Sequence, residues 1–196
     1  MEMSTKFFLC FSLVAMIYSY VILSSIYTYI DAKMPDPLPI ERDAVPTSQV
    51  LCHTTKGDLS IDVFSNWAPL GAAQFIQLVK DGFYTDIAMY RSVPGFLTQF
   101  GISDKPEYAD RHGRVIQDDK NLHVPVRKGY ISFAGSGLNS RSTQVFIAYT
   151  DLDYLGQEPW ETPFAQVTAN PTNFAVLESF YKMGDIKPFG DGYVRT

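Results

Sequence analysis

Short segments rich in β-branched and aromatic residues recur along the chain from residue 50 onward, and they limit its possible folds more than any other feature. A Lys56-Gly57-Asp58 turn between the first two segments is typical of a β-hairpin. Aromatic side chains pack well on pleated sheets, and the chain holds twelve Tyr and fourteen Phe. The pattern predicts a mainly β domain with strands over residues 50–54, 59–64, 89–93, 97–100, 130–133, 145–148 and 164–167.

Helical spacing is found in two places within this β-rich region. Pro69 suits a first helical turn, apolar residues recur at helical spacing from Ala72 to Val79, and Gly82 ends the pattern. A second helix is predicted over residues 173–182. Many short strands with two isolated helices favour a closed β-barrel whose ends the helices cover.

Residues 7–30 form an uninterrupted uncharged stretch near the N-terminus. A helix of this length spans about 36 Å, more than the roughly 30 Å hydrocarbon core of a bilayer. We therefore predict a retained transmembrane signal-anchor helix. The alternative is a cleavable signal peptide, whose apolar region usually runs only about 7–15 residues, and which would give a secreted protein. Four tyrosines in the second half of the stretch are typical of interfacial anchors: Tyr18, Tyr20, Tyr27 and Tyr29.

The composition divides the chain into four parts. Residues 1–6 are a short tail before the apolar stretch, residues 31–48 hold four prolines among charges and predict an extended spacer, and residues 49–196 form the globular domain. The charges after residue 30 sum to a negative value, so the positive-inside rule favours a cytoplasmic N-terminus. We expect a single-pass membrane protein of the secretory pathway, attached through residues 7–30, with its domain in a lumen or outside the cell.

Several classes of function are excluded or disfavoured. The net charge is −5 and the pI about 5.1, so the basic surface that nucleic-acid binding requires is not expected. His53, His112 and His123 are too widely separated to predict a metal site, and no phosphate-binding glycine loop occurs. We expect no cofactor. The adjacent carboxylates Asp118 and Asp119 are interpreted as solvated loop charges rather than metal ligands.

Two ordered motifs resemble the signatures of the cyclophilin family of peptidyl-prolyl cis-trans isomerases. Residues 89–101 read MYRSVPGFLTQFG, and the family shows an aromatic residue followed by HRVIPGFM, any residue and QGGD. Residues 129–137 and 142–147 read GYISFAGSG and STQVFI, and the family shows GxLSMANAG and GSQFFI. The resemblance covers roughly residues 49–184. It implies an eight-stranded antiparallel closed barrel capped by two helices.

The resemblance also implies roles for residues at the matching positions. Arg91 corresponds to the catalytic arginine, and Gln99 and Gln144 to polar residues that position this arginine and the peptide backbone. The others correspond to the substrate groove, in part to the pocket for the proline ring: Phe96, Leu97, Ala134, Gly135, Phe146, Tyr154 and Leu155.

Six positions depart from the family pattern. Tyr90 stands where the family has His beside the arginine, and Phe100 and Ile102 replace a glycine and an aspartate of the first motif. Gly135 replaces an Asn whose backbone binds substrate. Tyr154 stands where many members have Trp or His, which argues against binding of cyclic-peptide inhibitors, and Glu161 falls near a usual His.

The resemblance implies catalysed rotation about X-Pro bonds in protein clients, and with the apolar stretch it predicts assistance to folding near a membrane. The departures keep an alternative open, in which a weak or inactive domain binds proline-containing segments as a scaffold or as a subunit of a membrane complex. The expected partners are proline-containing polypeptides in either case.

Overall fold

A computed structural model describes residues 45–108, 110–111 and 113–185 of the chain. The predicted anchor at 7–30, the tail at 1–6 and most of the spacer at 31–48 lie outside these residues. Within the described ranges, the structure contains no helix that combines the length and apolar character needed to cross a bilayer.

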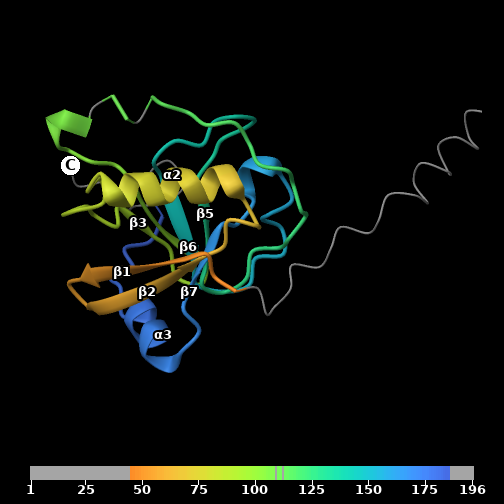
Figure 1. Cartoon of the computed structure of the whole chain (residues 1–196). Coiled ribbons are helices and arrows are strands. Elements are labelled where there is room, and N and C mark those ends of the chain that lie inside the picture. The colour runs from red at the N-terminus through yellow and green to blue at the C-terminus, as the bar shows by residue number, and fades with distance from the viewer. Residues whose placement is uncertain (1–44, 109, 112, 186–196) are drawn as a thin grey trace, which may run out of the picture. The chain divides into compact units, whose positions relative to one another are not determined.

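The described residues form one antiparallel sheet of seven strands in the order β1-β2-β7-β5-β6-β4-β3. Two α-helices lie on opposite sides of these strands (Figure 1). The strands are β1 (Ser48–Thr54), β2 (Gly57–Val63), β3 (Arg91–Ser92), β4 (Leu97–Phe100), β5 (Tyr130–Phe133), β6 (Val145–Ala148) and β7 (Ala165–Val167), and the helices are α2 (Pro69–Lys80) and α3 (Pro171–Glu178), with short 3-10 turns η1 (Pro106–Tyr108) and η2 (Pro159–Glu161).

The predicted closed eight-stranded barrel is only partly confirmed. Seven strands are present among the described residues, and β1 and β3 end the strand order without pairing with each other there. The described chain ends beside β3, where Gly184 forms an isolated antiparallel bridge with Ser92 rather than part of a longer strand.

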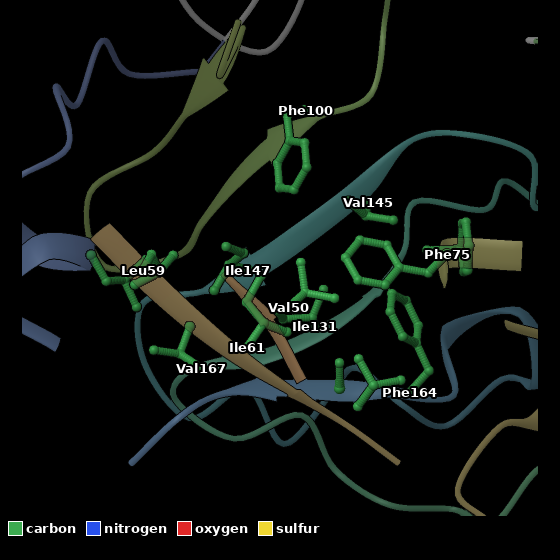
Figure 2. Close-up of a cluster of buried hydrophobic side chains, with 14 of the residues drawn as sticks. Val50, Leu59, Ile61, Phe75, Phe100, Ile131, Val145, Ile147, Phe164 and Val167 are labelled. Atoms are coloured by element: carbon green, nitrogen blue, oxygen red, sulfur yellow. The ribbon is translucent and has the colours of Figure 1, made fainter. Parts of the chain in front are cut away.

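The sheet separates two clusters of apolar side chains because neighbouring residues of a strand point to opposite faces. On β6, Val145 and Ile147 belong to the main core, whereas Phe146 and Ala148 belong to a second cluster on the other face. Figure 2 shows strand residues such as Val50, Ile61 and Ile147 converging with Phe75 of α2 in the main core. The second cluster is the one that positions the candidate site.

The helix predictions are right in existence and differ at the ends. α2 begins at Pro69, as expected, and buries a face that includes Ala72 and Phe75. α3 covers Pro171–Glu178 rather than 173–182. It begins earlier because the Asn170 side chain accepts a hydrogen bond from the Asn173 N–H at 2.8 Å, a typical N-cap.

A buried ion pair corrects the interpretation of Asp118 and Asp119 as solvated charges. Asp119 is buried and contacts Nη1 of Arg141 at 2.9 Å, and Asp118 lies 3.2 Å from Nε of Arg141. The Asp119 carboxylate also accepts hydrogen bonds from the N–H groups of Leu70 and Gly71, so it caps α2 from 48 residues away. The two carboxylates therefore hold a buried arginine and the first turn of a helix.

Three tyrosines that are wholly or partly shielded from solvent make the fold sensitive to alkali. Burial raises the pKa of Tyr90 to about 12 and also raises the pKa of Tyr84 and Tyr149. A tyrosine in the unfolded chain has a pKa of about 10, so above this pH the unfolded chain releases protons that the folded chain retains. We expect the free energy of unfolding to lose this contribution progressively as the pH rises from about 10 through the folded pKa values. Urea unfolding at pH 8 and pH 10.5 tests this, and Tyr84→Phe should reduce the fall. An equal fall in that variant would contradict the assignment to Tyr84.

Candidate active site

A row of side chains crosses four strands on the face that carries the second apolar cluster. Arg91 of β3 pairs with Gln99 of β4, Gln99 pairs with Phe146 of β6, and Phe146 pairs with Ser132 of β5. Directly opposed residues in an antiparallel sheet project on the same face. The register therefore brings the predicted arginine and a predicted glutamine, both of the first motif, beside a predicted pocket residue of the second motif.

The guanidinium of Arg91 is held on two sides. Its Nη1 donates to Oε1 of Gln99 at 3.3 Å, while Nε and Nη2 donate to the two carboxylate oxygens of Asp185 at 2.7 and 3.0 Å. Its Cζ lies 5.4 Å from the centroid of the Phe96 ring. These contacts fix a cationic, planar donor against an aromatic face.

A chain of hydrogen bonds continues from Arg91 into the sheet. Nε2 of Gln99 donates to Oε1 of Gln144 at 3.0 Å, and the hydroxyl of Tyr90 donates to the same Gln144 oxygen. Tyr90 is buried, and burial raises its pKa to about 12, so its hydroxyl stays protonated at neutral pH. Tyr90 thus acts as a neutral donor at the position where the family pattern has a histidine.

An apolar surface lies beside this polar chain. Leu97 and Phe146 are buried in the second cluster, and Phe96, Ala134 and Leu155 pack against it while partly exposed. Phe96 faces Tyr154, with ring centroids 6.3 Å apart and planes 25° from parallel. Tyr154 is 66% exposed, so it forms the outer edge of this surface.

Gly135 and Glu161, two of the departures from the family pattern, both contact the segment 156–162 or lie in it. A Cβ atom at Gly135 would approach Cβ of Trp160 to 2.9 Å and Cδ1 of its indole to 3.1 Å, so Trp160 occupies the space that a larger residue would need. The Glu161 carboxylate accepts a hydrogen bond from the Gly156 N–H at 3.0 Å and closes its own loop.

The structure adds one residue and one hydrogen bond to the site expected from the sequence, Asp185 and the bond between Tyr90 and Gln144. Asp185 was not predicted, because it follows both motifs and no local pattern marks it. The bond between Tyr90 and Gln144 joins residues 54 positions apart, and only the pairing of the strands reveals it.

The hydrogen bond from Tyr90 to Gln144 should affect activity equally between pH 6 and pH 9. Tyr90→Phe removes one of the two donors to Gln144 Oε1, so the Gln144 amide is held less firmly. We expect a several-fold fall in kcat/KM for the X-Pro rotation that the resemblance implies. The factor should be the same at pH 6, 7.5 and 9, because the phenol stays protonated throughout. A factor that changes across this range would contradict the neutral-donor role.

The sequence of this domain matches a known family over most of its length. The family model described as cyclophilin type peptidyl-prolyl cis-trans isomerase/CLD matches residues 49–189. This chain belongs to the cyclophilin family. The predicted resemblance is therefore confirmed for the domain, whereas the membrane anchor remains a prediction.

Relatives of this cyclophilin carry isomerase names. A peptidyl-prolyl cis-trans isomerase-like 2 of Aspergillus oryzae is 33% identical over 125 residues, which cover 61% of this chain and 21% of the relative. A peptidyl-prolyl cis-trans isomerase of Helicobacter pylori is 28% identical over 160 residues, which cover 78% of this chain and 94% of the relative. The chain thus spans about a fifth of the length of the first curated relatives and nearly all of the bacterial one.

Solved structures support the same fold. A Cryptosporidium parvum cyclophilin type peptidyl-prolyl cis-trans isomerase, determined in the presence of the dipeptide Ala-Pro, aligns with a TM-score of 0.55 at 23% identity. The alignment covers 67% of this cyclophilin and 85% of that chain.

Proposed function

We propose that this cyclophilin catalyses cis-trans rotation about X-Pro bonds in polypeptides. The observation that carries the proposal is the Arg91 guanidinium, held by Gln99 beside the apolar surface of Phe96 and Phe146. The family membership and the names of the relatives agree with it. Proline-containing polypeptides would be the substrates, as the Ala-Pro dipeptide in the structurally similar protein suggests.

The chemistry requires no nucleophile and no proton transfer. Rotation about the amide must overcome a barrier of about 18–20 kcal/mol, and unassisted exchange takes about 10–100 s. Exchange in milliseconds requires a lowering of roughly 5–6 kcal/mol. When the amide twists, its nitrogen becomes more pyramidal and can accept a hydrogen bond, which Arg91 could donate more strongly to the twisted than to the planar state.

Each side of the site would have a separate task. The apolar surface would hold the proline ring, and the Gln144 amide would contact the peptide backbone while its oxygen receives the Gln99 and Tyr90 donors. Tyr154 would narrow the outer edge of the apolar surface by stacking on Phe96. We therefore expect cyclic-peptide inhibitors to bind weakly or not at all. With the uncharged stretch at residues 7–30, we extend the proposal to clients near a membrane of the secretory pathway.

A second function is a binding module without turnover. The replacement of the family histidine by Tyr90 and the indole of Trp160 against Gly135 favour it, because both alter the groove beside a retained pocket. Such a domain would hold proline-containing segments as a scaffold.

An aromatic truncation tests the proposed function. Exchange in a short X-Pro peptide is followed by NMR with the full-length chain in mild detergent, beside Phe96→Ala and the control Phe174→Ala. Phe174 is matched because it also has a cation over its ring, with Lys128 Nζ 5.5 Å from the centroid. We expect Phe96→Ala to lower kcat/KM about tenfold or more and Phe174→Ala to leave it unchanged. A folded parent without acceleration on several residues before proline would instead support the binding module.

A further inference from the structure

The carboxylate of Asp185 forms a two-pronged ion pair with the arginine of the proposed site. Its two oxygens accept hydrogen bonds from Nε and Nη2 of Arg91 at 2.7 and 3.0 Å. Both side chains are about four-fifths shielded from solvent, with exposed fractions of 20% and 22%. A bidentate pair of this kind fixes the plane of a guanidinium as well as its position.

A backbone bridge to β3 places Asp185 beside Arg91. The Gly184 N–H donates to the carbonyl of Ser92 at 3.0 Å, and the two residues form an antiparallel bridge. The register of that bridge puts Asp185 opposite Arg91. Gly184 has a φ of +84°, in the left-handed region that favours glycine, so the residue before the aspartate suits the turn of the chain toward Arg91.

The two partners of Arg91 approach from opposite sides. Gln99 belongs to β4 on one side of β3, and Asp185 belongs to the segment that bridges to the other side. A guanidinium has five N–H groups, and these contacts use three, which leaves one on each Nη nitrogen without a partner among the described residues. The aspartate therefore orients the fork without occupying all of its donors.

We propose that Asp185 is a positioning residue for the isomerase reaction, which fixes the Arg91 guanidinium over Phe96 with two N–H groups directed at substrate. The inference rests on the proposed function and adds a residue outside the two sequence motifs. The C-terminal part of the described chain thereby becomes part of the active site, because displacing Gly184 from Ser92 would release Arg91 on one side.

The experiment compares Asp185→Asn and Asp185→Glu with the parent, as full-length chains in mild detergent. Asn keeps the shape of Asp but removes the charge and one acceptor, and Glu keeps the charge at greater length. We expect Asp185→Asn to lower kcat about ten- to a hundredfold with KM nearly unchanged, because a misoriented donor affects the transition state more than peptide binding. Asp185→Glu should recover part of the loss.

A second readout reports the ion pair itself. The Nε–H resonance of Arg91, assigned by comparison with Arg91→Lys, should be protected from solvent exchange in the parent and lose this protection in Asp185→Asn. The matched control is Asp81→Asn, which breaks a pair of similar exposure with Arg111 at 2.9 Å on the far end of α2. Asp81→Asn should leave kcat and the Arg91 resonance unchanged. An equal loss of kcat in Asp81→Asn and Asp185→Asn would show a general effect on folding rather than a role of Asp185 in the site.

The outcomes separate this inference from the proposed function. If the parent is active and Arg91→Ala is not, while Asp185→Asn keeps a kcat within about twofold of the parent, the positioning role is wrong and the isomerase function stands. A rise in kcat would also overturn it and would show that Asp185 competes with substrate. An unchanged Arg91 resonance in Asp185→Asn would show that the pair does not form. A parent without activity overturns the proposed function, and the positioning role falls with it.

Discussion

Arg91→Ala is expected to lower kcat/KM for X-Pro exchange by about a hundred- to a thousandfold while the domain remains folded. The loss follows because the variant removes the donor aimed at the twisted amide but leaves the apolar surface of Phe96 and Phe146 in place. Peptide affinity should therefore change far less than kcat. NMR exchange measurements at several peptide concentrations separate the two quantities.

Arg91→Lys separates the effect of the positive charge from the effect of the planar guanidinium. Lysine keeps a positive charge but lacks the planar fork that Gln99 and Asp185 hold together. We expect it to recover only a small part of the lost activity. A lysine variant with parental activity would show that charge alone stabilises the transition state, and an active alanine variant would remove Arg91 from the mechanism.

Arg141→Met is expected to have the largest effect on stability, a loss of about 3–5 kcal/mol in the free energy of unfolding. Arg141 is 1% exposed and pairs with Asp119, so its removal leaves a buried carboxylate without its cationic partner. The substitution should also destabilise α2, because the same carboxylate accepts hydrogen bonds from the N–H groups of Leu70 and Gly71 in its first turn. Urea unfolding followed by circular dichroism measures the change.

The control for this prediction is Arg127→Met. Arg127 pairs with Asp153 and Asp151 at the surface, and exposed pairs of this kind contribute only about 0–1 kcal/mol. A loss below about 1 kcal/mol in Arg141→Met would contradict the role of the buried pair. Its effect on activity should follow the fraction of folded chain, since Arg141 lies outside the proposed site.

The sequence predicted the mainly β fold with two helices, and the residues that the structure brings together in the candidate site, because both depend on local patterns; closure into an eight-stranded barrel is not seen among the described residues. Alternation in the segment 145–148 places Phe146 and Val145 on opposite faces. The first motif carries Arg91 and Gln99 on neighbouring strands, and the second carries Phe146 beside Gln99. Pro69 also marked the start of α2 correctly.

Features that depend on distant partners could not be predicted in this way. Asp119 was read as a solvated charge because its partner Arg141 is 22 residues away and only the fold buries both. Asp185 pairs with Arg91 across 94 residues, beyond both motifs. The end of α3 was misplaced because the apolar pattern continues past Glu178, whereas the helix ends there and Phe180 is buried after it.

The departures from the family pattern have physical counterparts in the structure. Tyr90 keeps a hydrogen bond to Gln144 in place of the expected histidine, and its raised pKa of about 12 keeps it neutral. Trp160 fills the space beside Gly135. The polar chain from Arg91 through Gln99 is retained, which is why we favour an active isomerase over a binding module.

One measurement tests this account most directly. The full-length chain in mild detergent is added at a small fraction of the concentration of an X-Pro peptide, and the cis-trans exchange rate is measured by NMR beside Arg91→Ala. The account predicts exchange of all the peptide at a rate proportional to the amount of chain, with most of the effect lost in the variant. Binding-induced shifts in the parent with exchange at the uncatalysed rate would contradict the proposed function and identify a binding module, because binding both isomers equally does not accelerate their exchange.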